Sequence, residues 1–184
     1  MSANHDTAGT DSVLRFWFDE HPKDWFVKNP DFDAEIRQRF LPLYEGAAAG
    51  QLAPWMDAPR SCLALVIVLD QFPRNLFRGS GRAFATDAQA RAAARVILAR
   101  GWDKAMTQSE QLFAYLPFEH SESLEDQDLS CELMKHFDAE QRQYAERHRD
   151  IIRRFGRFPH RNDSLGRQST PAEIEFLKQP GSGF

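Results

Sequence analysis

Three short segments of the chain combine charged or titratable side chains with bulky apolar ones. Their polar residues are Asp70, Gln71, Arg74, Asn75 and Arg78 in the first segment, His120, Ser121 and Glu122 in the second, and Arg157, His160, Arg161 and Asn162 in the third. Guanidinium groups bind carboxylates and phosphates through paired hydrogen bonds. An imidazole beside a carboxylate can act as a general acid or base. These residue types therefore predict either anion binding or acid–base catalysis.

The first segment follows a run of apolar residues and should lie at the end of a buried helix. Polar groups in such a position must find partners. One interpretation is structural, with Asp70 paired to an arginine and with Gln71 and Asn75 bonded to loop backbone. The other is functional, with Arg74 and Arg78 forming a fork for a carboxylate or a phosphate.

The second and third segments are predicted to be loops. His120 and Glu122 follow Pro117, which should end a helix, and loops between helices often carry functional residues. Capping of the next helix is the structural alternative for Glu122, whereas histidine has no strong capping preference. The third segment follows Gly156. A loop that only connects helices has little need for an imidazole, two guanidiniums and an amide together, which favours a binding role.

Other motifs are negative or point to structural roles. His148 lies on the apolar face of a predicted helix and is expected to be a core histidine bonded to a carbonyl. Glu132 and His136 share a helix face, but one carboxylate and one imidazole make a poor metal site. The sequence contains no HExxH, P-loop, dinucleotide or nucleophile-elbow motif. We therefore predict neither a metal nor another cofactor.

We predict that the three segments meet around one cleft, because charged groups beside bulky apolar residues are costly unless they find partners. The first hypothesis is a binding module that holds a small anionic ligand or an acidic peptide end in a concave cleft. Its ligand-binding residues would be Arg74, Asn75, Arg78, Arg157, Arg161 and Asn162. The second hypothesis is an enzyme that uses the same cleft. Its catalytic candidates are His120, Glu122, His160 and Asp70. The third is a structural or interaction protein without a small-molecule site.

The elements that position these segments are predicted to be helices, because apolar residues recur at steps of three and four along most of the chain. Residues 59–71 are apolar all round, which suits a helix at the centre of a helical domain. A strand is the alternative, since the run contains β-branched residues, but no other strand is available to pair with it. Leu65, Val66 and Leu69 should be almost fully buried, and Pro73 should end this helix.

Helix boundaries are indicated by capping boxes at Thr86, Thr107 and Thr170. Eight to nine helices with short connections predict an all-α fold, an antiparallel helical array or superhelix. The length of 184 residues fits one domain over residues 1–184, with residues 1–10 and 179–184 as loose tails.

Composition excludes several classes of function. A net charge of −4 gives no global electrostatic reason to expect nucleic acid as a partner. The longest apolar run, Leu63–Leu69, is too short to span a bilayer, and the first residues lack the pattern of a signal peptide. The two cysteines, Cys62 and Cys131, are predicted to be buried thiols. We therefore expect a cytoplasmic protein without membrane or nucleic-acid partners, and the sequence does not determine its oligomeric state.

Four ordered motifs carry a resemblance to a known family. They are LDQFPRNLFRG at residues 69–79, FATD at 84–87, LPFEHSES at 116–123 and GRFPHRN at 156–162. With these motifs the chain resembles the bacterial domain-of-unknown-function family nine-two-four, from about Phe16 to Leu177. The resemblance implies a tetratricopeptide-like α-superhelix and brings no established activity. Glu119, within the third motif, is left out of the predicted site.

Overall fold

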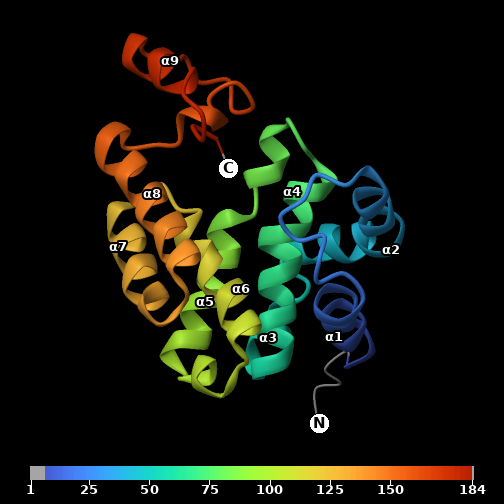
Figure 1. The fold of residues 1–184 in the computed structure, drawn as a ribbon. Helices are drawn as coiled ribbons and strands as arrows, with labels where there is room; N and C mark the ends of the chain where they lie inside the picture. Colours follow the sequence, from blue (N-terminus) through green and yellow to red (C-terminus); the bar gives the residue numbers. More distant parts are fainter. Residues whose placement is uncertain (1–6, 184) are drawn as a thin grey trace. The chain divides into compact units, whose positions relative to one another are not determined.

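The computed structural model describes residues 7–183, which contain helices and turns and no strand (Figure 1). The α-helices are α1 (Thr7–Leu14), α2 (Pro30–Ala48), α3 (Pro59–Val66), α4 (Phe72–Leu76), α5 (Asp87–Ala99), α6 (Gln108–Glu119), α7 (Leu124–Leu133), α8 (Ala139–Phe155) and α9 (Pro171–Leu177). Two π-helical segments are η1 (Arg15–Glu20) and η3 (Ile67–Gln71). The 3-10 turns are η2 (Ala53–Asp57), η4 (Gly81–Phe84), η5 (Trp102–Ala105), η6 (Met134–His136) and η7 (Pro159–Arg161). The predicted all-α class is confirmed, and the tetratricopeptide-like superhelix stays a prediction.

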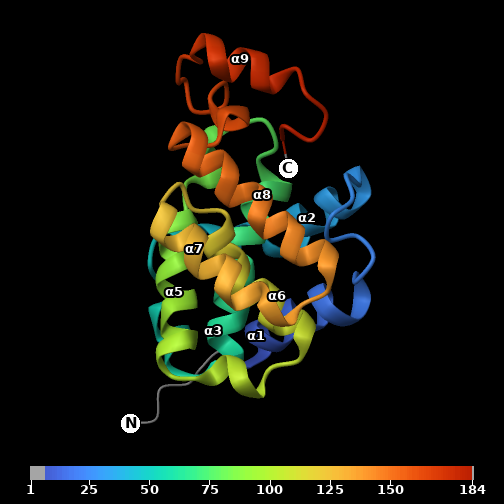
Figure 2. The ribbon, with the colours of Figure 1, turned by 60° about the vertical axis from the view of Figure 1, so that its left-hand side comes forward.

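Contacts divide the chain into two compact units. The first consists of residues 1–78 and 82–117, and the second of residues 79–81 and 118–184. Residues 79–81 are a short excursion into the second unit, and the chain passes to that unit again near the end of α6. In the second unit α7 and α8 pack side by side (Figure 2). Among the described helices, none has both the length and the apolarity needed to cross a membrane.

The chain ends are more structured than the predicted loose tails. Helix α1 already begins at Thr7, and the Thr10 side chain is buried. Near the other end, the Ser182 hydroxyl donates a hydrogen bond to the Leu177 carbonyl at 3.1 Å. Residues 1–6 and 184, which also belong to those tails, lie outside the described residues.

Helix α3 and segment η3 form the centre of the first unit. Every residue from Ser61 to Pro73 is buried, and α3 packs against α1, α5 and η2. Leu65, Val66 and Leu69 are 3%, 0% and 3% exposed, so their predicted burial is confirmed. An all-apolar surface on a helix requires neighbours on every side, and this position supplies them. The strand alternative for this run is wrong.

Pro73 does not end the helical path, contrary to the prediction. Segment η3 closes with a hydrogen bond from the Phe72 N–H to the Ile67 carbonyl, and Pro73 then occupies the first turn of α4. Proline is tolerated there because a first-turn N–H has no helical acceptor in any case. The Leu69 carbonyl, four residues before the proline, instead accepts the Thr86 hydroxyl at 2.5 Å.

The Thr86 hydroxyl, which was predicted to cap α5, is used in the hydrogen bond to Leu69 instead. Its side chain makes no cap hydrogen bond to α5, so the predicted box at Thr86 is wrong. The boxes at Thr107 with Glu110 and at Thr170 with Glu173 are formed as predicted.

Helix α6 also continues past its proline. Pro117 was expected to end the helix, but α6 extends to Glu119. All side chains from Leu112 to Glu119 are buried. Burial of several large apolar groups, at about 1.5–3 kcal/mol each, outweighs a cost of roughly 3 kcal/mol for a proline inside a helix. Glu119 therefore belongs to the helix, and the second predicted segment starts directly after it.

Candidate functional site

The first predicted segment forms an ion-pair network in the first unit. The Asp70 side chain is fully buried, and its Oδ2 accepts a hydrogen bond from Gln71 Nε2 at 2.6 Å. Arg74 Nη1 lies 3.4 Å from Asp70 Oδ1, and both terminal nitrogens bind the Asp87 carboxylate at 3.0 and 3.2 Å. Burial disfavours the Arg74 cation, but the charges of Asp70 and Asp87 outweigh this effect and raise its pKa. Arg74 is therefore matched by internal carboxylates.

The other arginine of this segment is matched in the same way. Arg78 Nε and Nη2 bind the Asp33 carboxylate at 2.5 and 2.9 Å, and Asn75 Nδ2 donates to Asp33 Oδ1 at 2.8 Å. Asp33 lies in the first turn of α2, where acidic residues are common. Its position in the sequence therefore did not indicate that it would bind Arg78. The predicted fork for a carboxylate thus binds a carboxylate of the protein itself.

The second and third predicted segments meet in the second unit. Glu122 accepts the Phe158 amide at 2.8 Å and binds the Arg167 guanidinium at 2.7 and 2.9 Å. Arg167 Nη2 also donates to the Phe158 carbonyl at 3.1 Å. Burial alone would raise the pKa of Glu122. Hydrogen bonds from Arg167 and the Phe158 amide, together with the charges of Arg167 and Arg161, have the larger effect, and the pKa is lowered. Glu122 and Arg167 therefore fix the position of Phe158.

Three basic side chains lie against the buried Phe158 ring, and a fourth, His120, lies beside one of them. His148 meets the ring edge-on at a centroid distance of 5.6 Å, and His160 lies at the same distance in a tilted arrangement. The Arg161 guanidinium lies 4.5 Å from the ring centroid. The His120 ring is 6.4 Å from the His148 ring, and Glu119 Oε1 is 3.3 Å from His148 Nδ1. We call these residues the Phe158 cluster: Glu119, His120, His148, Phe158, His160 and Arg161.

His148 is a core histidine, as predicted. Its Nδ1 donates to the Tyr144 carbonyl at 2.8 Å. Burial lowers the pKa of His148 to about 3, with smaller contributions from the charges of His120, Arg161 and His160. His148 is therefore neutral near pH 7. Glu119, left out of the predicted site, is the carboxylate in contact with it.

The remaining two predicted ligand-binding residues connect the third segment to α9. Arg157 binds the Glu173 carboxylate at 2.6 and 2.8 Å. Asn162 donates to the Ser169 hydroxyl at 3.0 Å and accepts from Arg167 Nε at 3.0 Å. The hydrogen bond from Arg157, together with donors from Thr170, lowers the pKa of Glu173 to about 2 in spite of its burial. Arg157 and Asn162 thus act within the protein.

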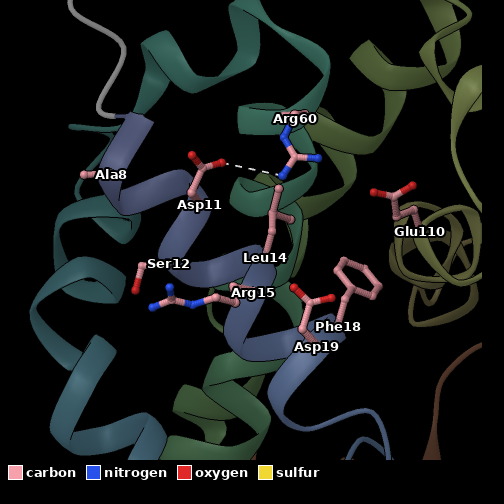
Figure 3. A pocket seen from close by; sticks show the side chains of 9 residues that line it. All are labelled: Ala8, Asp11, Ser12, Leu14, Arg15, Phe18, Asp19, Arg60 and Glu110. Atoms are coloured by element: carbon pink, nitrogen blue, oxygen red, sulfur yellow. Dashed lines mark ion pairs between the residues drawn. The ribbon is translucent and has the colours of Figure 1, made fainter.

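A pocket of about 510 Å³ opens on the first unit, away from the predicted site residues of that unit (Figure 3). Its charged lining residues are Asp11, Arg15, Asp19, Arg60 and Glu110. Arg60 forms an ion pair with Asp11 at 3.5 Å, drawn as a dashed line in Figure 3. Three carboxylates face two guanidiniums there, so this pocket offers no excess of positive charge for an anion.

The first segment lies in the first unit, and the second and third segments lie in the second unit. The structure brings the second and third segments together through Glu122 and Phe158. A cleft shared by all three segments stays a prediction.

Comparison with known proteins identifies the family. The family model described as "Bacterial protein of unknown function (DUF924)" matches residues 13–181. The chain belongs to the DUF924 family. The solved structure of the protein of unknown function ATU0120 from Agrobacterium tumefaciens is similar, with 41% sequence identity and a TM-score of 0.90. The similarity covers 94% of this chain and 98% of that one. No curated protein matches the chain at a significant level.

The identification confirms the resemblance carried by the four motifs, because all of them lie within the matched residues. A description as a protein of unknown function assigns no activity to a DUF924 member. The Phe158 cluster and the contacts around it are therefore the basis for a functional proposal.

The contacts of Glu122 with Arg167 predict a measurable loss of stability. We expect Glu122→Gln to lower the free energy of unfolding by about 1–3 kcal/mol, because the amide leaves the partly buried Arg167 without its carboxylate. Chemical denaturation of the two proteins measures this difference. Glu146 is exposed on α8 in the same unit, so Glu146→Gln should change stability by less than about 0.5 kcal/mol. Equal losses in both variants would contradict the role given to Glu122.

Proposed function

We propose that this DUF924 protein is a binding module whose Phe158 cluster holds a small anion, with a carboxylate or phosphate group as the recognised chemistry. The observation that carries the proposal is that His148, His160 and Arg161 lie against the Phe158 ring and that His120 lies beside His148. Imidazoles and guanidiniums supply N–H donors, and hydrogen bonds from charged donors to carboxylates or phosphates are the stronger kind. The charges of His120, His160 and Arg161 all lower the pKa of His148, which supports their mutual proximity.

The contacts narrow the set of ligand-binding residues. Internal carboxylates engage Arg74, Arg78 and Arg157, and the amides of Asn75 and Asn162 serve neighbouring side chains. The proposal rests on His120, His160 and Arg161 because their charges act on His148 within the Phe158 cluster. Arg161 is 6% exposed, and hydrogen bonds of a buried guanidinium are stronger than those of an exposed one.

An enzyme that uses the same residues is less well supported. Glu119 and His148 form the histidine–carboxylate contact within the cluster, with Glu119 Oε1 3.3 Å from His148 Nδ1. A general base works best with a pKa near the operating pH, whereas the pKa of His148 is about 3. Binding without catalysis is therefore the function that the geometry favours. The proposal includes a cytoplasmic location, because Cys62 and Cys131 are free thiols.

A thermal-shift titration with inorganic phosphate and with citrate tests the proposal. A ligand of the folded protein stabilises it by about 2.7 kcal/mol at a hundredfold excess over its dissociation constant. We expect such a shift for at least one of these anions, and we expect His160→Gln to reduce it. His136 is exposed in the same unit, so His136→Gln serves as the control and should leave the shift unchanged. Equal shifts in both variants would place the anion elsewhere, and no shift with either anion would favour a structural or interaction protein.

A further inference from the structure

Three potential metal ligands lie together in the first unit, outside the Phe158 cluster. Glu20 ends η1, His21 follows it, and Glu35 lies in the second turn of α2. Each offers one ligand atom, and the three atoms lie within 4.8 Å of one another. His21 Nε2 is 3.3 Å from Glu35 Oε2. We infer that Glu20, His21 and Glu35 bind a divalent transition-metal ion.

The position of the His21 ring favours ligation through Nε2. Its Nδ1 faces Asp24 Oδ2 at 3.1 Å, and Asn29 Nδ2 holds the other Asp24 oxygen at 2.9 Å. The ring lies against Phe16 and Phe32, at centroid distances of 4.5 and 5.0 Å. When Nδ1 carries the ring proton and donates it to Asp24, Nε2 has a lone pair to offer a metal ion. Histidine ligands of metals are oriented in this way by a carboxylate on the second ring nitrogen.

The two glutamates already converge on a cation. Arg39 Nη1 lies 2.8 Å from Glu20 Oε2 and 2.9 Å from Glu35 Oε1. The same guanidinium lies over the rings of Phe16 and Phe40, at 4.6 and 5.1 Å from their centroids. A bound metal ion would take over these carboxylate oxygens, and Arg39 would keep its contacts with the rings. Arg39 is therefore a built-in competitor of the metal ion.

The ligand set selects the class of metal. One imidazole nitrogen and two carboxylate oxygens suit Zn²⁺ and Mn²⁺, whereas Mg²⁺ and Ca²⁺ prefer oxygen ligands alone. Three protein ligands leave coordination positions for solvent or a small ligand. A pattern on a single helix, such as Glu132 with His136, does not mark this set of ligands. Here the ligands come from η1, the residue after it, and α2.

Isothermal titration of the untagged full-length chain with ZnCl₂, and separately with MnCl₂, tests the site at pH 7.5. We expect one ion per chain for at least one of the two metals. Glu35→Gln, which removes a ligand with little change of shape, should weaken binding at least about tenfold, and Asp24→Asn by about 10- to 100-fold. Arg39→Met should bind more tightly, because the competing guanidinium is gone.

Matched controls separate this site from adventitious binding. His136 and Glu132 are exposed in the second unit, so His136→Gln and Glu132→Gln should bind the metal like the wild type. Each variant is compared by thermal melting without metal, so that only folded proteins are titrated. Equal affinities for the wild type, His21→Gln and Glu35→Gln would overturn the inference, as would binding that is lost only in His136→Gln. The result is independent of anion binding at the Phe158 cluster, because the two sites share no residue.

Discussion

Replacement of Leu65 by alanine should lower the free energy of unfolding by about 2–5 kcal/mol. Leu65 lies in α3, which packs against α1 and α5, and its side chain is 3% exposed. Truncation loses the transfer free energy of the buried methyl and methylene groups and leaves a cavity that the surrounding helices fill only in part. Denaturant titration of the wild type and the variant gives the difference directly.

An exposed leucine provides the matched control. Leu124 is 43% exposed at the start of α7, so Leu124→Ala should cost less than about 0.5 kcal/mol. A loss below about 1 kcal/mol for Leu65→Ala would mean that α3 does not form the centre of the first unit. A similar loss in both variants would show that burial does not control the cost.

Acidification from pH 7.5 to pH 5 should destabilise the protein by about 2 kcal/mol through His148 alone. In the folded protein the pKa of His148 is lowered to about 3, compared with 6.5 for an ordinary histidine. Between these values the unfolded chain binds a proton that the folded protein does not, so stability falls as the pH falls. Above the ordinary histidine pKa, His148 is neutral in both the folded and the unfolded state, and this loss of stability is absent. Below it, the free energy of unfolding falls by up to about 1.4 kcal/mol for each pH unit.

The measurement compares the pH dependence of stability in two variants. In His148→Gln the group is absent, so its free energy of unfolding should fall by about 2 kcal/mol less than that of the wild type between pH 7.5 and pH 5. His136→Gln should follow the wild type, because His136 is exposed. Glu122 and Glu173 have lowered pKa values, and they affect stability mainly below this range. Parallel curves for the wild type and His148→Gln would show that His148 is not buried in its neutral form.

Patterns with a local cause were predictable from the sequence. Residues 59–71 are apolar on every side, and this property alone predicts a central helix when no partner strand is available. The capping boxes at Thr107 and Thr170 formed for the same reason, since their donors and acceptors lie within one turn of the chain. The burial of His148 followed from its place on an apolar helix face. The motifs also indicated the family correctly.

Features that depend on distant partners were decided only by the tertiary structure. The sequence supplied Arg74, Arg78 and Arg157 as candidate anion binders, but it could not show that Asp87, Asp33 and Glu173 would reach them. These carboxylates lie 13, 45 and 16 positions away, and nothing in their local pattern marks them as partners of an arginine.

The two prolines show the same division between local and tertiary causes. Local preference predicts that Pro73 and Pro117 end helices, whereas the π-turn before Pro73 and the burial around Pro117 let the chain continue.

By itself the sequence determined which segments are helical, which helix is central and which family the chain belongs to. Tertiary packing decided which charges neutralise one another and which basic groups gather around Phe158. The physical reason is that helix formation depends on neighbours within a few residues, whereas charge pairing depends on groups that only folding brings together.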